Sequence, residues 1–161
     1  MEPRIEKISE KKLIGKRLKM TLSNDRTSEL WQSFMPDRKE IKNNLSADLF
    51  CLQIFDEFFD FKDFNQDTEF EKWAAVEVSD FNKIPVEMKT RTLKGGMYAV
   101  FIHKGLASDF HKTFQFIFSS WLPKSEYELD QREHFELLGD KYKNNDPSSE
   151  EEVWIPIKRK E

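Results

Sequence analysis

The chain has 161 residues, of which 15 are Phe, 4 Trp and 3 Tyr, while 35% are charged and the formal net charge is −4. This aromatic content excludes disorder over most of the length, and no apolar run approaches the roughly 20 residues that a membrane-spanning helix needs. The negative charge gives no general attraction to nucleic acid or anionic membranes. Because the N-terminal segment lacks the apolar stretch of a signal peptide and Cys51 is a lone cysteine, we expect a cytoplasmic protein.

In the first half, the residue pattern predicts a strand, a helix and two further strands. Alternating apolar and polar residues over 11–21 predict a half-buried strand. Apolar residues at helical spacing over 27–35 predict a helix, which Pro36 ends or kinks. Apolar stretches at 49–55 and 72–79 predict the next two strands.

The second half repeats this order of elements. Residues 97–103 form a strong strand pattern, and the apolar residues between 110 and 121 fall on one face of an amphipathic helix. Two strands are predicted at 134–139 and 151–158. Pro156 in the last of them predicts an edge strand or a bulge, because proline cannot donate a ladder hydrogen bond.

The predicted helices also match at their C-terminal ends, where residues 33–36 (SFMP) correspond to residues 120–123 (SWLP). Together with the shared order of elements, this match predicts an internal duplication within one domain, 1–161. The first repeat covers about 11–79 and the second about 96–158. We expect an α+β fold of two strand-helix-strand-strand units related by a pseudo-two-fold axis, with antiparallel sheets and a ligand groove between the halves.

The connection over 56–71 interleaves Phe with acidic residues. One interpretation is a long surface loop held in place by Phe58, Phe59, Phe61 and Phe64. The other is an acidic and aromatic lid over the groove, which would suit a cation.

No motif for catalysis, metal binding or cofactor binding is present. The three histidines, His103, His111 and His134, have no zinc-site spacing, and we interpret them as ordinary polar or packing residues. We therefore expect neither a metal nor a cofactor. The basic residues between 4 and 19 are predicted to form the solvated face of a first strand starting near residue 11, without direct nucleic-acid binding.

The last predicted strand carries a candidate site for a hydrophobic cation. Glu152 and Trp154 share one face with Pro156, while the opposite face is apolar apart from Glu151 and resembles core. Glu152 is either one of a solvated run of acids or a carboxylate partly withdrawn from water beside an indole. In the second case it would favour a cationic partner.

Three segments together resemble the GyrI-like small-molecule-binding domain, which is also the effector-binding module of many AraC-type and MerR-type bacterial regulators. They are GGMYAVFIHKG at 95–105, SSWLPKSEYELDQREHFELLGD at 119–140 and EEEVWIPIK at 150–158. The resemblance covers about 3–158 and implies two strand-helix-strand-strand units, in agreement with the duplication.

The resemblance also implies that amphipathic, often cationic, compounds bind between the halves. Glu152 matches the acidic residue expected to meet the cation, with Trp154 in the aromatic position, and Glu136 of the Phe-Glu pair is a second acidic candidate. Tyr98 matches the tyrosine of the family's glycine-tyrosine strand. The predicted ligand-binding residues are Glu152, Trp154, Glu136, Tyr98, Trp121, Phe118, Trp31 and Phe34.

Three functions follow from this resemblance. The leading hypothesis is a stand-alone binding module for amphipathic, cationic or aromatic compounds. The alternatives are a hydrolase of electrophilic cyclopropane-bearing compounds that uses the same groove, and a protein-interaction module acting on a topoisomerase. Whether the chain is an enzyme stays open. Because the sequence shows no DNA-binding domain, we do not expect it to regulate transcription by itself; a monomer is compatible with the sequence.

Overall fold

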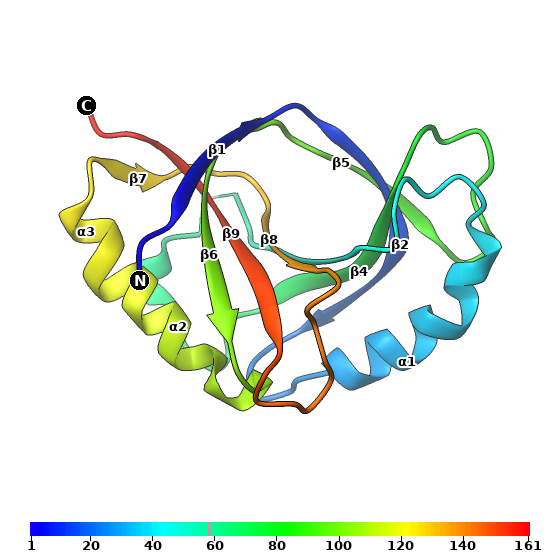
Figure 1. Ribbon diagram of the computed structural model, residues 1–161, viewed down its shortest axis with the longest axis horizontal. Coiled ribbons are helices and arrows are strands. Elements are labelled where there is room, and N and C mark those ends of the chain that lie inside the picture. The colour runs from blue at the N-terminus through cyan, green and yellow to red at the C-terminus, as the bar shows by residue number, and fades with distance from the viewer. Residues whose placement is uncertain (58) are drawn as a thin grey trace.

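The structure, a computed structural model, describes residues 1–57 and 59–161, apart from the side chain of Lys62, and shows one curved sheet with helices on its outside (Figure 1). The strands are β1 (Arg4–Ile8), β2 (Lys11–Met20), β3 (Leu49–Ile54), β4 (Phe70–Val78), β5 (Lys89–Leu93), β6 (Gly96–Lys104), β7 (Tyr127–Leu129), β8 (His134–Leu138) and β9 (Glu150–Arg159). The helices are α1 (Thr27–Asp37), α2 (Phe110–Phe116) and α3 (Leu122–Lys124), with a π-helical turn η4 (Ile117–Trp121) and short 3-10 turns η1 (Arg38–Glu40), η2 (Phe61–Asp63) and η3 (Ala107–Asp109).

The predicted α+β class is confirmed, and every strand pair is antiparallel. The strand order is β1-β6-β9-β8-β3-β4-β2-β5, with β7 paired to β9. The predicted strands begin and end within two residues of the observed ones. The expectation that the first strand starts near residue 11 is wrong, because β1 already begins at Arg4. Strands β1 and β5 contain few apolar residues, so backbone pairing rather than hydrophobic patterning places them in the sheet.

The sheet closes on itself through one long strand pair. β1 pairs β6 and β2 pairs β5 in the same register, since Ile8 faces Gly96 and Lys11 faces Leu93. β1 and β2 therefore lie as one long strand alongside β5 and β6. Because β1 and β5 are the two ends of the strand order, this pairing closes the sheet. A Cβ on Gly95 would lie 2.6 Å from the Ile8 carbonyl oxygen, which explains a glycine at the junction.

Closure gives the sheet an inner face and an outer face. The side chains buried on the inner face are Leu13, Phe50, Leu52, Trp73, Ala75, Leu93, Tyr98, Val100, Phe135 and Trp154. On the outer face, α1 packs Leu30 and Phe34 over β2 and β4, while α2 and η4 cover β6 and β9 through Ile117 and its neighbours. The central strands β3 and β8 lie between the two helix-covered parts, as the strand order requires.

The position of Pro156 differs from the prediction, because β9 is an interior strand. It pairs β6 on one side, while on the other its partner changes from β8, at residues 152–154, to β7, at residues 157–159. Pro156 lies at that change, and its carbonyl accepts the Asp130 N–H at 3.0 Å. The N and O of one strand residue point to the same side of the strand. The nitrogen of Pro156 therefore points toward the change from β8 to β7, where the strand ladder needs no N–H donor.

The helix predicted over 110–121 is divided. Regular α-helical hydrogen bonding ends at Phe116, and η4 carries the chain to α3, which extends one residue beyond Pro123. Phe110 and Phe114 are half-buried, and Phe110 packs against the cluster beneath α2. In the described part of the chain, no helix has the length and apolar character to cross a membrane.

Replacing Gly15 by alanine should lower the free energy of unfolding toward the upper end of about 1–3 kcal/mol. A Cβ at this position would lie 2.0 Å from the Ala74 carbonyl oxygen and 2.7 Å from Ala75 Cα, and both are backbone atoms of the paired strand β4. Urea unfolding followed by Trp fluorescence measures the change. Gly139→Ala is the matched control, since its nearest neighbour is Asp48 Oδ1 at 3.3 Å; equal losses in the two variants would contradict the steric argument.

Candidate functional site

The eight predicted ligand-binding residues lie on two different faces of the sheet. Tyr98, Glu152 and Trp154 lie on the inner face, because side chains alternate along β6 and β9. The residues on the outer face or on the helices that cover it are Glu136, Phe118, Trp121, Trp31 and Phe34. No single surface therefore contains all eight.

On the inner face, Glu152 and Trp154 already hold a cation from the chain itself. Arg4 Nη2 pairs with Glu152 Oε2 at 2.8 Å, and the guanidinium carbon lies 5.7 Å from the centroid of the Trp154 ring. The indole N–H of Trp154 donates to the other carboxylate oxygen at 3.0 Å. The Glu152 side chain is 28% exposed.

The same arrangement recurs in the first half of the chain. Trp73 Nε1 donates to Glu71 Oε1 at 2.7 Å, and Arg17 lies over the Trp73 ring at 5.7 Å with Nη1 3.8 Å from Glu71 Oε2. Both halves therefore carry a Glu-x-Trp sequence whose carboxylate and indole hold an arginine. These two Glu-x-Trp sequences lie in strands, so the match between the helix ends at 33–36 and 120–123 did not reveal them.

On the outer face, the central strands carry a group of polar side chains that we call the central acidic cluster: Cys51, Gln53, Lys72, Glu136 and Glu151. Cys51 of β3 is paired directly with Glu136 of β8, and Gln53 of β3 is paired with Lys72 of β4. Glu136 is only 9% exposed. Its Oε2 has no hydrogen-bond partner among the residues that the structure describes.

Burial dominates the electrostatics of the central acidic cluster. It raises the pKa of Glu136 to about 7, against an opposing effect of Lys72, and raises the pKa of Glu151 to about 7 as well. Burial opposes the charged form of Lys72, but the combined charges of its neighbours raise the pKa of its amine. Burial also raises the pKa of the Cys51 thiol to about 12. The cluster therefore combines two carboxyls that ionise near neutral pH with a charged lysine and a neutral thiol.

His134 lies two residues before Glu136 on the same face of β8. It is 5% exposed, and its Nδ1 lacks a hydrogen-bond partner within the described part of the chain. Burial lowers the pKa of His134 to about 3, so the ring is neutral. Two unpartnered buried polar atoms thus occur on one short strand, and such atoms are rare in native proteins.

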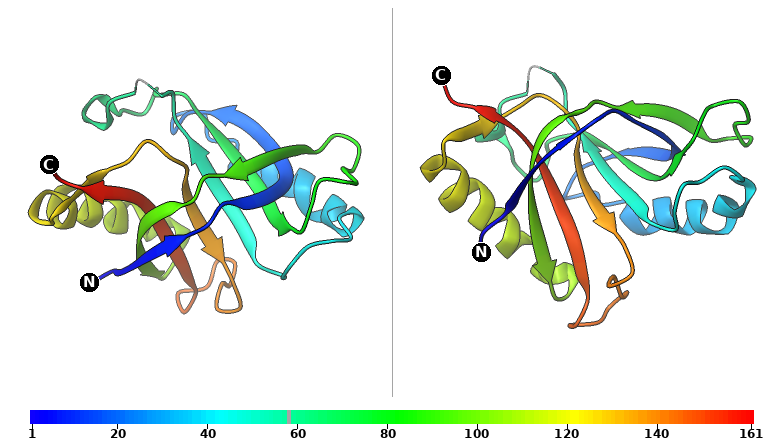
Figure 2. Two further views of the ribbon diagram at one scale, coloured as in Figure 1. Left: turned by 90° about the horizontal axis from the view of Figure 1, so that it is seen from above. Right: turned by 45° about the horizontal axis from the view of Figure 1, so that its top comes forward.

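Aromatic rings cover His134. The ring centroid of Phe61 lies 5.1 Å from that of His134 and 5.7 Å from that of Phe118, in nearly parallel planes with the latter. Phe55 lies 5.6 Å from His134, and Phe59 contacts both Phe55 and Phe61, which also contact each other at 4.8 Å. Figure 2 shows this segment on the same side of the molecule as α2. The described part of the connection 56–71 therefore packs beside the central acidic cluster; Phe58 lies outside the described residues.

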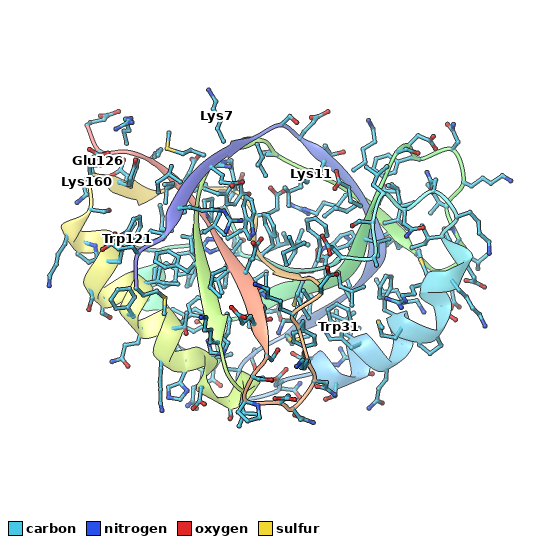
Figure 3. All side chains as sticks on the ribbon, in the orientation of Figure 1. Lys7, Lys11, Trp31, Trp121, Glu126 and Lys160 are labelled. Atoms are coloured by element: carbon cyan, nitrogen blue, oxygen red, sulfur yellow. The ribbon has the colours of Figure 1, made fainter. Side chains whose placement is uncertain are left out.

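The predicted helix residues differ in how they are placed. Phe34 is fully buried beneath α1 and meets Trp31 edge to face at 6.1 Å. Trp121 packs on Phe101 and Tyr127 at the β7 end of the molecule. Figure 3 shows Trp121 beside the helix at the left and Trp31 beside α1, a little right of the centre. Of the four predicted helix aromatics, Phe118 contacts His134.

Sequence reasoning did not identify Lys72, Glu151, His134 or Gln53 as parts of a site. A usable signal was present, because Lys72 and Glu151 are charged residues on otherwise apolar faces of predicted strands. Their proximity depends on which strands become neighbours. Among the residues described, no group of three or more His, Cys, Asp and Glu side chains could hold a metal ion.

A separate hollow of about 660 Å³ lies away from these residues. It is lined by residues from 39–43 and 80–86, including the exposed side chains of Ile84 and Val86. None of the eight predicted ligand-binding residues lines it.

The fold, with two helices on the outside of an antiparallel sheet and polar groups buried between them, is that of a small-molecule-binding domain. The chain belongs to the family of GyrI-like small-molecule-binding domains, whose match covers residues 1–158. The resemblance inferred from the three sequence segments is thereby confirmed.

Individual relatives include both regulators and ligand-bound domains. The transcriptional regulator BrlR of Pseudomonas aeruginosa is 28% identical over 137 residues, which is 83% of this chain and 47% of BrlR. The chain thus spans about half the length of that relative.

Two solved structures share the fold over nearly the whole chain. SAV2435 bound to tetraphenylphosphonium gives a TM-score of 0.72 at 18% identity, covering 98% of this chain and 94% of that one. The C-terminal domain of EcmrR gives a TM-score of 0.72 at 17% identity, covering 99% of this chain and 98% of that one. At 17–18% identity, this structural similarity establishes that the chain shares the fold of these two proteins.

Proposed function

We propose that this chain binds lipophilic organic cations at the central acidic cluster, with Glu136 as the carboxylate that neutralises the ligand. The observation that carries the proposal is the buried Oε2 of Glu136, which has no hydrogen-bond partner among the described residues. A carboxylate withdrawn from water is costly unless a cation compensates it. A bound cation would supply that compensation.

The surroundings of Glu136 suit a delocalised, apolar cation. Rings of Phe55, Phe61 and Phe118 surround the neighbouring His134, and aromatic faces attract cations by about 0.5–2 kcal/mol each. SAV2435, which shares the fold, binds tetraphenylphosphonium, a lipophilic cation. A ligand reaching Glu136 would take the place of rings that now pack on His134, two residues away on the same face of β8.

The second acidic candidate, Glu152, is a weaker choice. Its carboxylate already pairs with Arg4 and accepts the Trp154 N–H, so both oxygens have partners. A cation entering there would have to displace Arg4, which strand β1 holds in place. The inner face is therefore satisfied by the chain itself, in contrast to the central acidic cluster.

Paired isosteric variants test this assignment. We expect Glu136→Gln to weaken tetraphenylphosphonium binding at least tenfold, because it removes the negative charge of a buried carboxylate whose Oε2 has no hydrogen-bond partner among the described residues. Glu152→Gln, on the adjacent strand and the opposite face, should change the affinity less than threefold. Trp fluorescence titration at pH 7.5 gives both affinities, and circular dichroism checks the fold. A loss confined to Glu152→Gln, or no binding by the unmodified chain, would overturn the proposal.

A hydrolytic function at the same cluster is a second candidate. A carboxyl group with a pKa of about 7 is suited to general acid-base catalysis near neutral pH. In that case an electrophilic cyclopropane-bearing compound should be turned over by the unmodified chain and not by Glu136→Gln. Absence of turnover by a chain that binds tetraphenylphosphonium would leave binding as the function.

A further inference from the structure

We propose that Lys72 is a resident counter-ion that restricts the central acidic cluster to ligands carrying a single positive charge. This inference rests on the proposed function and adds a specificity-determining residue to it. Lys72 is predicted to act by compensating one of the two cluster carboxylates permanently, so that only one is left for a ligand.

Strand register brings Lys72 to the cluster. Lys72 faces Gln53 of β3, whose next outer-face residue, Cys51, faces Glu136 of β8. The Cα atoms of Lys72 and Glu136 are therefore about two strand spacings apart and one outer-face position displaced, or roughly 12 Å. The Lys72 ammonium acts on both cluster carboxyls across this space, because its charge opposes the rise in the pKa of Glu136 and of Glu151.

The amine of Lys72 is fixed in this position. Its Nζ donates to the hydroxyl of Thr27, the first residue of α1, at 3.0 Å. Thr27 in turn is tied to Asp25, which accepts hydrogen bonds from both the backbone N–H and the hydroxyl of Thr27. Lys72 thus spans from the sheet to the start of the helix, on the side of the cluster that faces α1.

When both of its carboxyls are ionised, the central acidic cluster carries one negative charge in excess. Glu136 and Glu151 each contribute one negative charge when ionised, and Lys72 contributes one positive charge. Cys51 and His134 are neutral at pH 7, because burial raises the pKa of the thiol and lowers that of the imidazole. Asp25, which also lies near Lys72, is an exposed residue whose charge is screened by water.

This balance predicts which ligands fit. A monocation brings the buried charge to zero, which is the arrangement that a low-dielectric site favours. A dication would leave one positive charge buried without a partner, beside the charged Lys72. Without Lys72, two carboxylates would be uncompensated and the preference would shift toward the dication.

The test compares two probes of similar chemistry and different charge. Tetraphenylphosphonium is the monocation, and p-xylylene-bis(triphenylphosphonium) is the dication; tetraphenylborate, with the shape of the first and the opposite charge, controls for apolar binding. We expect the dication-to-monocation ratio of association constants to rise at least tenfold in Lys72→Met. Lys72→Arg, which keeps the charge, should retain the ratio of the unmodified chain.

Lys19→Met is the matched control, because it removes one lysine charge from β2 at a side chain that is 73% exposed. Its ratio should equal that of the unmodified chain. If Lys72→Met fails to fold, Lys72→Gln replaces it, with the same expected increase. An unchanged ratio in the folded Lys72 variant, while the unmodified chain still binds the monocation, overturns this inference alone. No binding of either cation by the unmodified chain overturns the proposed function as well.

Discussion

Glu136→Gln should make the protein more stable than the unmodified chain by an amount that grows with pH, about 2–3 kcal/mol larger at pH 8 than at pH 5. Burial raises the pKa of Glu136 from its ordinary value of 4.5 to about 7 in the folded state. Between these two values the folded protein holds a proton that the unfolded chain has released. Stability therefore falls as the pH rises from 4.5 through 7, and glutamine removes that loss.

Comparing the variant with the unmodified chain isolates Glu136 from two other groups. Glu151, whose pKa is also raised to about 7 by burial, lowers stability over the same pH window. His134 acts in the opposite direction, because its pKa is lowered to about 3 and its contribution is lost as the pH falls below 6.5. Both groups remain in the variant, so the difference reports Glu136 together with its charge interaction with Glu151.

Urea unfolding at pH 5, 6, 7 and 8 measures this difference. Glu152→Gln serves as the control for loss of a carboxylate, since that side chain is partly exposed and already paired with Arg4. We expect the control to follow the unmodified chain at every pH. A constant offset between Glu136→Gln and the unmodified chain from pH 5 to 8 would show that Glu136 ionises in the folded state as it does in the unfolded chain.

Ligand binding should show the complementary dependence. Because a bound cation favours the ionised form of Glu136, the affinity for tetraphenylphosphonium should rise up to tenfold per pH unit below pH 7 and then level off. Loss of this rise in Glu136→Gln would assign it to that residue.

Arg132→Ala should lower the free energy of unfolding by about 3 kcal/mol, the second large effect that the structure predicts. The Arg132 side chain is 8% exposed and pairs with Asp130 at 2.7 Å. Its guanidinium also donates to the carbonyls of Met97 and Ile157 and lies 4.6 Å from the centroid of the Tyr98 ring. One side chain therefore connects β6, β9 and the turn between β7 and β8.

Arg159→Ala is the matched control for Arg132→Ala. Arg159 also lies over a tyrosine, Tyr127, and pairs with a carboxylate, Glu126, but its side chain is 65% exposed. Exposed pairs contribute about 0–1 kcal/mol, so the loss should stay within that range. Similar losses in the two variants by urea unfolding would contradict the importance assigned to the buried guanidinium.

Much of the fold followed from periodicity. Alternation at two residues and recurrence at helical spacing predicted the strands and helices that bury one apolar face. Strands β1, β5 and β7 escaped because they are short, and β1 and β5 are largely exposed and polar, so they have little side-chain pattern. The closure of the sheet could not be read either, since it depends on the common register of two strand pairs far apart in sequence.

For the candidate site, the sequence by itself determined the family and supplied Glu136 and Glu152 as the acidic candidates. The tertiary structure decided that these carboxylates lie on opposite faces, that Arg4 already neutralises Glu152, and that Lys72, Glu151 and His134 are near Glu136. The physical reason is that a strand's own alternation fixes which side chains share a face. Which strand lies beside it, and so which charges meet and lose water, is set by long-range pairing that no local pattern encodes.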